Sequence, residues 1–294
     1  HYGGGIYIGS GSPSLTGSTV YGNHAVDGGG LWTQSSLTIS GSTIEGNVAT
    51  NNGGGVYTSQ SITFSTSTVK TNQATNSGGG LYLLNEASSL TSVIINLNSA
   101  SIGGGAALEN SNAEFTDCNF DANTVTAQGA GMYVHLAAPK LTRVNFDSNL
   151  ATSGPGTQQG GGLHIYSASP LIVDSTFTNN SAKSEGGGAF NNLGSPILRN
   201  PTFKGNQGSF GGGMYSYKGS VTIENGTFGN NQAEYGGGYA TYDSPTIIRG
   251  CNVTGNLATR TGNASEGGGL WVEAPLTLTN CVLDGNTADI FGGG

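Results

Sequence analysis

Charged residues are scarce in this chain: they make up 9% of its 294 residues, and only nine are Lys or Arg. The formal net charge is −8 and the basic residues are scattered singly, so no basic face exists to hold phosphates. The composition therefore argues against nucleic acid and anionic membranes as partners. With so little charge, Ser, Thr, Asn and Gln must solvate the surface, which favours an extracellular or cell-surface location.

Long apolar runs and paired cysteines are missing too. No run approaches the roughly 20 residues that a bilayer-spanning helix needs, so we expect no direct membrane insertion. The three cysteines, Cys118, Cys251 and Cys281, are no disulfide framework. Each stands two residues before a large apolar residue, in a slot that Ser42 and Ser67 fill elsewhere, which predicts an inward-facing column of small side chains. Cys251 and Cys281 are one repeat apart and would come within disulfide reach.

Clustered catalytic groups are the third absence. Glycosidases and polysaccharide lyases need carboxylates about 5–10 Å apart, or an acidic calcium pocket with a base. Asp121 and Asp147 share one position in successive repeats, but no basic residue repeats beside them. The histidines are far apart in sequence and in repeat phase, so they predict neither a metal triad nor a Ser-His-Asp set. They are His1, His24, His135 and His164. We predict no catalytic residue, no metal and no cofactor.

Glycine is abundant instead, with 53 residues, and much of it stands in a periodic triplet. By subtraction, successive triplets start 25, 25, 25, 25, 26, 31, 26, 25, 25, 31 and 25 residues apart. They begin at Gly3, Gly28, Gly53, Gly78, Gly103, Gly129 (as Gly-Ala-Gly), Gly160, Gly186, Gly211, Gly236, Gly267 and Gly292. This regularity indicates one unit stacked on copies of itself, so residues 1–294 are predicted to be a single repeat domain. Both ends fall at the same repeat phase, and we expect a segment of a longer chain or a unit that stacks end to end.

Each period holds three short apolar segments separated by turn residues. They alternate with period two and are rich in Thr, Val, Ile and Tyr, as in Leu37-Thr38-Ile39, and no window shows helical spacing. Equivalent residues stay in columns only if each strand pairs in parallel with its counterpart one period later. We therefore predict an all-β fold, a right-handed parallel β-helix of about 11 coils, with three short strands per coil of about 25 residues.

One asparagine per period falls 19 or 20 residues after the first glycine of its triplet. The side-chain amide can bond its own turn and the next coil, and asparagine tolerates the left-handed backbone conformation. We predict a structural amide ladder at one corner, because eleven equivalent amides make no catalytic site. Its members are Asn23, Asn47, Asn72, Asn98, Asn123, Asn149, Asn180, Asn206, Asn231, Asn256 and Asn286.

Two periods are 31 residues long because of insertions at 150–159 and 257–266. Both fall between the asparagine and the next glycine triplet, so we expect them to bulge from the same edge of the rod. Insertions on one face of a solenoid are often where it meets a partner. A tolerated surface loop explains them equally well.

The second residue after most triplets is aromatic. Strand alternation puts it on the opposite face from its aliphatic neighbours, so inward aliphatics predict an outward aromatic stripe along the rod. The presence of His164 in this set favours exposure. Such a stripe suits stacking on sugar rings or packing against a second rod, whereas internal rings would be the alternative. The set is Tyr7, Trp32, Tyr57, Tyr82, Tyr133, His164, Phe190, Tyr215 and Trp271.

Four Asn-x-Ser/Thr sequons are present, which would be acceptors for N-glycosylation in a eukaryote. They are Asn179, Asn225, Asn252 and Asn263, the last of them in an inserted loop.

The glycine-rich turn and the Phe-x-x-Asn turn occur together at fixed spacing, as in Phe177-Thr178-Asn179-Asn180 followed by Gly186-Gly187-Gly188-Ala189. This combination resembles the repeat of the chlamydial polymorphic membrane proteins and related β-helix surface proteins, over essentially the whole chain. The resemblance implies a cell-surface or secreted adhesin-like passenger.

We therefore expect a non-enzymatic extracellular β-helix with a structural or adhesive role, including that of a self-stacking filament subunit. Its partners would be other copies of itself or a cell-surface protein or glycan. The alternative is a carbohydrate-binding or carbohydrate-cleaving β-helix of the pectin-lyase-like kind. Tryptophan fluorescence and product release on adding oligosaccharides separate these expectations.

Overall fold

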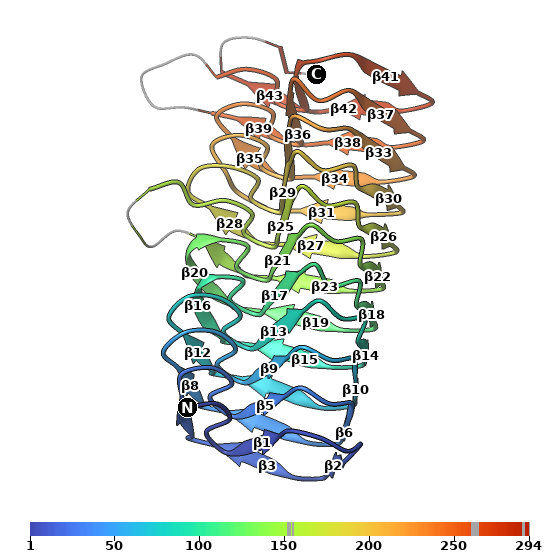
Figure 1. Cartoon of the computed structure of the whole chain (residues 1–294). Coiled ribbons are helices and arrows are strands. Elements are labelled where there is room, and N and C mark those ends of the chain that lie inside the picture. Colours follow the sequence, from blue (N-terminus) through green and yellow to red (C-terminus); the bar gives the residue numbers. More distant parts are fainter. Residues whose placement is uncertain (152–153, 155, 260–264, 290–291, 294) are drawn as a thin grey trace.

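The computed structural model describes residues 1–151, 154, 156–259, 265–289 and 292–293. These residues form a right-handed parallel β-solenoid, in which each strand pairs in parallel with its equivalent one coil away (Figure 1). The predicted fold class is confirmed. Among the described residues no helix is long and apolar enough to cross a membrane.

Three main sheets run along the rod, each with eleven strands in the described part of the chain. The first sheet, whose strands follow the glycine triplets, contains β1 (Ile6–Ile8), β5 (Leu31–Thr33), β9 (Val56–Thr58), β13 (Leu81–Leu84), β17 (Ala106–Glu109), β21 (Met132–His135), β25 (Leu163–Tyr166), β29 (Ala189–Asn192), β32 (Met214–Tyr217), β36 (Tyr239–Tyr242) and β40 (Leu270–Glu273).

The second sheet contains β2 (Ser14–Thr16), β6 (Leu37–Ser40), β10 (Ile62–Ser65), β14 (Ser89–Thr91), β18 (Glu114–Thr116), β22 (Lys140–Thr142), β26 (Leu171–Val173), β30 (Ile197–Arg199), β33 (Val221–Glu224), β37 (Thr246–Arg249) and β41 (Leu276–Thr279). The third contains β3 (Thr19–Tyr21), β7 (Thr43–Glu45), β11 (Thr68–Lys70), β15 (Ile94–Asn96), β19 (Asn119–Asp121), β23 (Asn145–Asp147), β27 (Thr176–Thr178), β31 (Thr202–Lys204), β34 (Thr227–Gly229), β38 (Asn252–Thr254) and β42 (Val282–Asp284).

Most coils add a short fourth strand after the ladder asparagine, which the sequence pattern did not predict. These strands are β4 (His24–Ala25), β8 (Val48–Ala49), β12 (Gln73–Ala74), β16 (Ser99–Ile102), β20 (Thr124–Gln128), β24 (Leu150–Ala151) and β28 (Ser181–Ala182), then β35 (Gln232–Ala233), β39 (Leu257–Ala258) and β43 (Thr287–Ala288). Apart from β16 and β20 these strands have two residues, which is too short for a period-two pattern to be recognised in the sequence. Both inserted segments, 150–159 and 257–266, begin with such strands, β24 and β39, and so start on the same side of the rod; positions 152–153, 155 and 260–264 lie outside the described residues.

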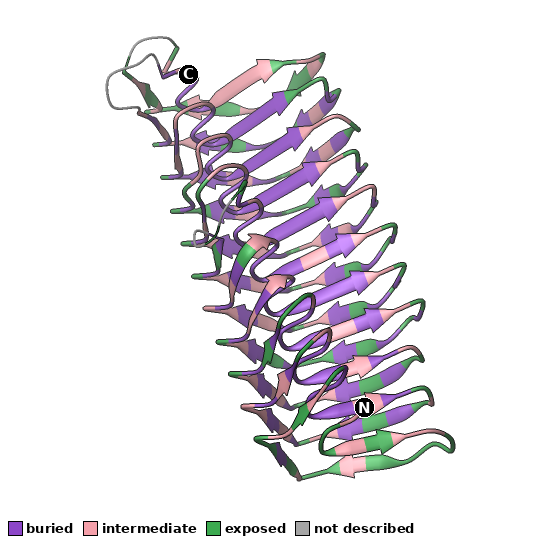
Figure 2. Ribbon diagram, turned by 60° about the vertical axis from the view of Figure 1, so that its left-hand side comes forward, coloured by how far each residue is buried: buried purple, intermediate pink, exposed green. Residues whose placement is uncertain are grey.

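The core fills the inside of the coils, and the coils at both ends are less covered than those between them (Figure 2). In the third sheet the middle residue of each strand points inward and is buried in every coil but the last, and five consecutive coils use phenylalanine there. Their rings stack with centroids 4.5–5.0 Å apart, because parallel in-register strands bring identical residues together. The five are Phe120, Phe146, Phe177, Phe203 and Phe228.

The small inward column predicted from the Ser and Cys residues is present. Ser42, Ser67, Cys118 and Cys251 are all buried, and the Ser67 hydroxyl accepts a hydrogen bond from the Ser42 amide at 3.0 Å. Cys281 holds the same place in the last described coil, with its sulfur 3.4 Å from the amide nitrogen of Cys251. All three cysteines are free thiols.

The asparagine ladder is confirmed. At each of its ten steps, the backbone N–H and the side-chain amide of one asparagine both donate to the Oδ1 of the next, at 2.9–3.1 Å. From Asn47 onward each amide also donates to a main-chain carbonyl of the preceding coil, as Asn149 does to Phe120 at 2.9 Å. The ladder thus supplies the buried corner with the partners that its polar groups need.

The sequence had led us to expect the left-handed backbone conformation on the ladder asparagine itself. It is found instead on the residue before each ladder asparagine. That residue has φ between 51° and 67° in all eleven coils, and it is Gly or Asn in seven of them. The ladder amide must point inward to bond its neighbours. The preceding residue therefore takes the positive φ that turns the chain.

The glycine triplets bring the coils close together beside the ladder. The first glycine of every triplet has φ between 60° and 69°. A Cβ on the third glycine would meet the next coil: at Gly55 it would lie 2.6 Å from the carbonyl oxygen of Gly80 and 3.1 Å from the amide nitrogen of Asn72. The two sequence motifs are therefore in contact, which explains their constant spacing.

Candidate functional site

The aromatic set of the first sheet forms one column on the outer side of its strands. The register is continuous, with Tyr7 beside Trp32, Trp32 beside Tyr57, and so on to Trp271. Ala107 and Ala240 occupy the two remaining places. The residues on either side of each ring, such as Leu31 and Thr33, are buried inside the coil, except beside Tyr7 and Trp271 in the end coils, where they are partly buried. We call this set the aromatic column.

The aromatic column is not an exposed stripe along the whole rod, and in this respect the sequence-based expectation was wrong. Tyr7 is 55% exposed and the next rings are half-buried, but His164, Phe190 and Tyr215 are almost completely buried. The rings also stack on one another, as Tyr7 does on Trp32 with centroids 4.9 Å apart and planes 2° apart. Ring faces used in this way are not free for a ligand.

The presence of His164 in the aromatic column had favoured exposed rings, yet the His164 residue is only 1% exposed. Its ring packs edge-on against Tyr133 and Phe190, with centroids 5.3 and 4.9 Å away, and neither ring nitrogen has a hydrogen-bond partner. Burial lowers the pKa of His164 to about 3, because the charged imidazolium would have no solvation there. His164 is thus a neutral member of the aromatic packing.

Two further columns flank the aromatic one and complete what we call the three-column face. One consists of the residues just before the glycine triplets: Tyr2, Asp27, Asn52, Ser77, Ile102, Gln128, Gln159, Glu185, Phe210, Tyr235 and Glu266. The other consists of the last residues of the longer first-sheet strands: Leu84, Glu109, His135, Tyr166, Asn192, Tyr217, Tyr242 and Glu273. Neither column was predicted from the sequence, although the residues of both stand at a constant offset from the glycine triplets.

The His135 and Glu109 side chains are in contact on this face, with the His135 Nδ1 2.5 Å from a carboxylate oxygen. His135 also stacks on Tyr166 at 5.0 Å and lies 6.3 Å from Tyr133. The histidines are far apart in sequence and repeat phase, but His135 and His164 lie on adjacent strands, β21 and β25, in neighbouring columns. The described residues contain no group of three or more side chains suited to holding a metal ion.

The tyrosines of the column lie in a setting that disfavours negative charge. Burial, and secondarily Asp27 and Tyr2, raises the pKa of Tyr57. Burial, followed by the charge of Glu109, raises the pKa of Tyr82 to about 12. The carboxylates near the rings, Asp27 and Glu109 among them, favour cationic over anionic groups at this face.

A cleft of about 550 Å³ opens at the C-terminal end of this face. It is lined by six aromatic rings and two carboxylates: Phe210, Tyr215, Tyr217, Tyr235, Tyr242, Trp271, Glu266 and Glu273. The Trp271 indole N–H donates to Glu266 at 3.1 Å and so holds that carboxylate at the rim. Six rings around one opening resemble the lining of ligand sites more than that of a solvated surface.

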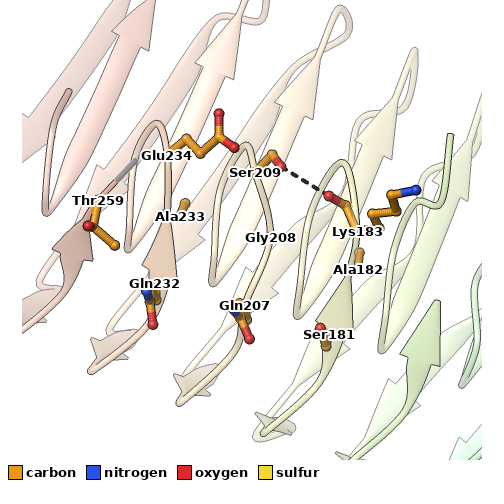
Figure 3. A pocket seen from close by; sticks show the side chains of 10 residues that line it. All are labelled: Ser181, Ala182, Lys183, Gln207, Gly208, Ser209, Gln232, Ala233, Glu234 and Thr259. Atoms are coloured by element: carbon orange, nitrogen blue, oxygen red, sulfur yellow. Dashed lines mark hydrogen bonds between the residues drawn. The ribbon is translucent and has the colours of Figure 1, made fainter. Parts of the chain in front are cut away.

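A second hollow is a polar trough along the fourth strands, shown in Figure 3, with a volume of about 490 Å³ between Ser181 and Thr259. An equivalent hollow of about 270 Å³ spans positions 73–126. Both hollows are lined by the residues two positions after the ladder asparagines: Ala182, Gly208 and Ala233 in the larger one, and Ala74, Ala100 and Val125 in the smaller one. Figure 3 shows glutamine, serine, lysine and glutamate side chains around the larger hollow, without aromatic rings.

The model of one family, described as the right-handed beta helix region, matches residues 2–182 and 104–288. The chain belongs to the right-handed β-helix family. No curated protein and no solved structure matches it.

Within this β-helix the other sequence-predicted positions are separate from the face. Asp121 and Asp147 are paired in register on the third sheet, where Asp147 accepts a hydrogen bond from Thr178 at 2.6 Å. The sequon asparagines Asn179, Asn225 and Asn252 are exposed, and Asn263 lies outside the described residues. The three-column face is therefore the part of the described chain where aromatic rings, carboxylates and histidines lie together.

Proposed function

We propose that this β-helix is a non-enzymatic adhesive module of the cell surface or extracellular space, which contacts a cell-surface protein or glycan through its three-column face. The observation that carries the proposal is the in-register aromatic column with its two polar flanks. Because the rod is rigid and presents these groups at a fixed repeat, the protein loses little conformational entropy on binding.

Aromatic rings with polar tips are the side chains that contribute most to protein interfaces. Tyr7 and Tyr242 are 55% and 41% exposed, at opposite ends of the face. The carboxylates of Glu109, Glu266 and Glu273 add polar groups to the same face. The face thus combines apolar area with directional hydrogen-bonding groups, as adhesion requires.

The test is bead adhesion. Beads coated with the chain are retained on cells or extracellular material, and the double variant Tyr57→Ser/Tyr242→Ser is expected to reduce retention. Tyr21→Ser is the matched control, because Tyr21 is 69% exposed on the third sheet, away from the face. Equal retention of the face variant and the control variant would contradict the proposal.

Carbohydrate binding or cleavage is the second candidate, favoured by the combination of rings and two carboxylates in the C-terminal cleft. Incubation with a panel of oligosaccharides tests it directly. New reducing ends or unsaturated products would show an enzyme and exclude the adhesive proposal as stated. Retention of intact oligosaccharide would show a glycan as the partner.

A further inference from the structure

Tyrosines of adjacent coils share a column at two places on the three-column face. Tyr57 and Tyr82 do so in the aromatic column, and Tyr217 and Tyr242 end strands β32 and β36 in a flanking column. Parallel strands hold the two rings of each pair one coil apart, so the rings stack, with centroids 5.1 and 5.6 Å apart respectively. Each pair thus brings two oxidisable phenols into contact.

The Tyr217–Tyr242 pair is the more accessible of the two. Tyr242 is 41% exposed, Tyr217 is partly exposed, and both line the C-terminal cleft with their ring planes 14° apart. The next residues of their column are Asn192 on one side and Glu273 on the other, neither of which is aromatic. A radical formed on this pair therefore has no third ring of the column to move to.

A tyrosine that loses one electron must also lose its phenolic proton, and the surroundings of Tyr217 favour that loss. The Lys218 ammonium nitrogen lies 5.0 Å from the centre of the Tyr217 ring, and a hydrogen bond with Tyr217 raises the pKa of Lys218. Tyr215 lies 6.5 Å from Tyr217, but burial raises the pKa of its phenol. A phenoxyl radical therefore forms more readily on Tyr217 than on Tyr215.

The Tyr57–Tyr82 pair lacks these advantages. Burial raises the pKa of Tyr57, and it raises the pKa of Tyr82 to about 12. The Trp32 indole lies 6.0 Å from the Tyr57 ring and competes with it as an electron donor. An oxidant should therefore join this pair more slowly than Tyr217 and Tyr242.

We propose that Tyr217 and Tyr242 form a dityrosine cross-link when the chain meets hydrogen peroxide and a peroxidase. Each phenol loses one electron and its proton, and the two phenoxyl radicals join through a bond between ring carbons next to the hydroxyl groups. The hydrogens on those carbons move to the oxygens, which restores both phenols. The two electrons and two protons reduce one peroxide molecule to two water molecules. This modification site goes beyond the proposed adhesive function.

The register makes the coupling intramolecular. Two groups held in contact react as if at a very high local concentration, so a dilute chain should join Tyr217 to Tyr242 before it joins another chain. The exposure of Tyr242 leaves room for the rings to turn from a stacked to an edge-joined arrangement. Tyr21 is more exposed, at 69%, but its register partner is Glu45, so exposure alone should not produce a bond there.

Mass spectrometry locates the bond. The dilute full chain is treated with peroxidase and hydrogen peroxide, unfolded in urea and digested with a glutamate-specific protease. Cleavage after each glutamate puts the two tyrosines in separate peptides, 186–224 and 235–266. We expect these two peptides to be joined with the loss of two hydrogen atoms, and fragment ions to place the bond at Tyr217 and Tyr242.

Two variants and a matched control test the pair. Tyr217→Phe and Tyr242→Phe each keep the ring stack but remove one phenol, so each should abolish the joined peptides. Tyr21→Phe makes the same change at the most exposed tyrosine and should leave their yield unchanged. The cross-linked chain should also melt at a higher temperature than the oxidised Tyr242→Phe chain, because the bond restricts the unfolded state.

Any of four results would overturn the inference: no joined peptides after oxidation, a bond at Tyr215 or Tyr235 instead, joined peptides that persist in Tyr242→Phe, or bonds that form only between chains. Bead adhesion is measured without an oxidant, so the proposed function stands or fails separately from the cross-link.

Discussion

Acid should destabilise this β-helix through one residue, His164. Burial lowers its pKa to about 3 in the folded chain, against an ordinary value of 6.5. Between these two pH values the unfolded chain binds a proton that the folded chain does not. The neutral ring's contribution to stability is therefore complete above pH 6.5 and is lost as the pH falls toward 3.

The size of this effect follows from the two pKa values. Each pH unit in the window removes about 1.4 kcal/mol from the free energy of unfolding. The loss is about 2 kcal/mol at pH 5 and about 5 kcal/mol below pH 3. His164→Phe should remove this dependence, because phenylalanine matches its column neighbour Phe190 and leaves no unpaired ring nitrogens.

Urea denaturation at pH 7 and pH 5, followed by circular dichroism, measures the difference. The parent chain should lose about 2 kcal/mol more than His164→Phe between the two pH values. The same substitution at the exposed His24 separates the effect of burial from that of losing a histidine. Parallel pH dependences for the parent and His164→Phe would refute the reasoning.

Three further outcomes follow from the packing. Asn149→Ala leaves main-chain groups of adjacent coils unpaired and should cost about 2–6 kcal/mol of unfolding free energy, measured by denaturation; a cost below about 0.5 kcal/mol would show that the ladder is dispensable. Gly80→Ala places a Cβ 2.5 Å from a carbonyl oxygen and should lower the melting temperature, whereas Gly229→Ala, with no neighbour closer than 3.9 Å, should not; equal melting temperatures would contradict this account of the triplets. Burial raises the pKa of Cys118 to about 11, so at pH 8 a thiol reagent should modify the half-exposed Cys281 first and Cys118 only on unfolding; equal rates would show that the coil opens there.

Parts of the candidate site could be predicted and parts could not. The aromatic column was found because each ring stands at a constant offset from a glycine triplet, and strand alternation then determines its face. The burial of His164 could not be found in this way, since it depends on side chains of adjacent coils. The flanking columns could have been predicted, because Tyr217 and Tyr242 stand at the same distance from the glycine triplet in successive repeats.

The C-terminal cleft could not be predicted from the sequence. Its rings come from positions 210 to 271, and Phe210 packs against both Tyr215 and Trp271 beside the fully buried Ala240. An alanine in a column of aromatic residues is visible in the sequence. Whether neighbouring rings collapse into the space or leave it open is decided by their packing.

The amino-acid sequence by itself determined the coil, the parallel pairing and the register of this β-helix. Glycine and asparagine recur at one spacing, and only stacking in register lets every triplet meet a ladder amide. The tertiary structure alone decided which outward side chains are covered and where the face opens, because exposure depends on neighbours that belong to other coils.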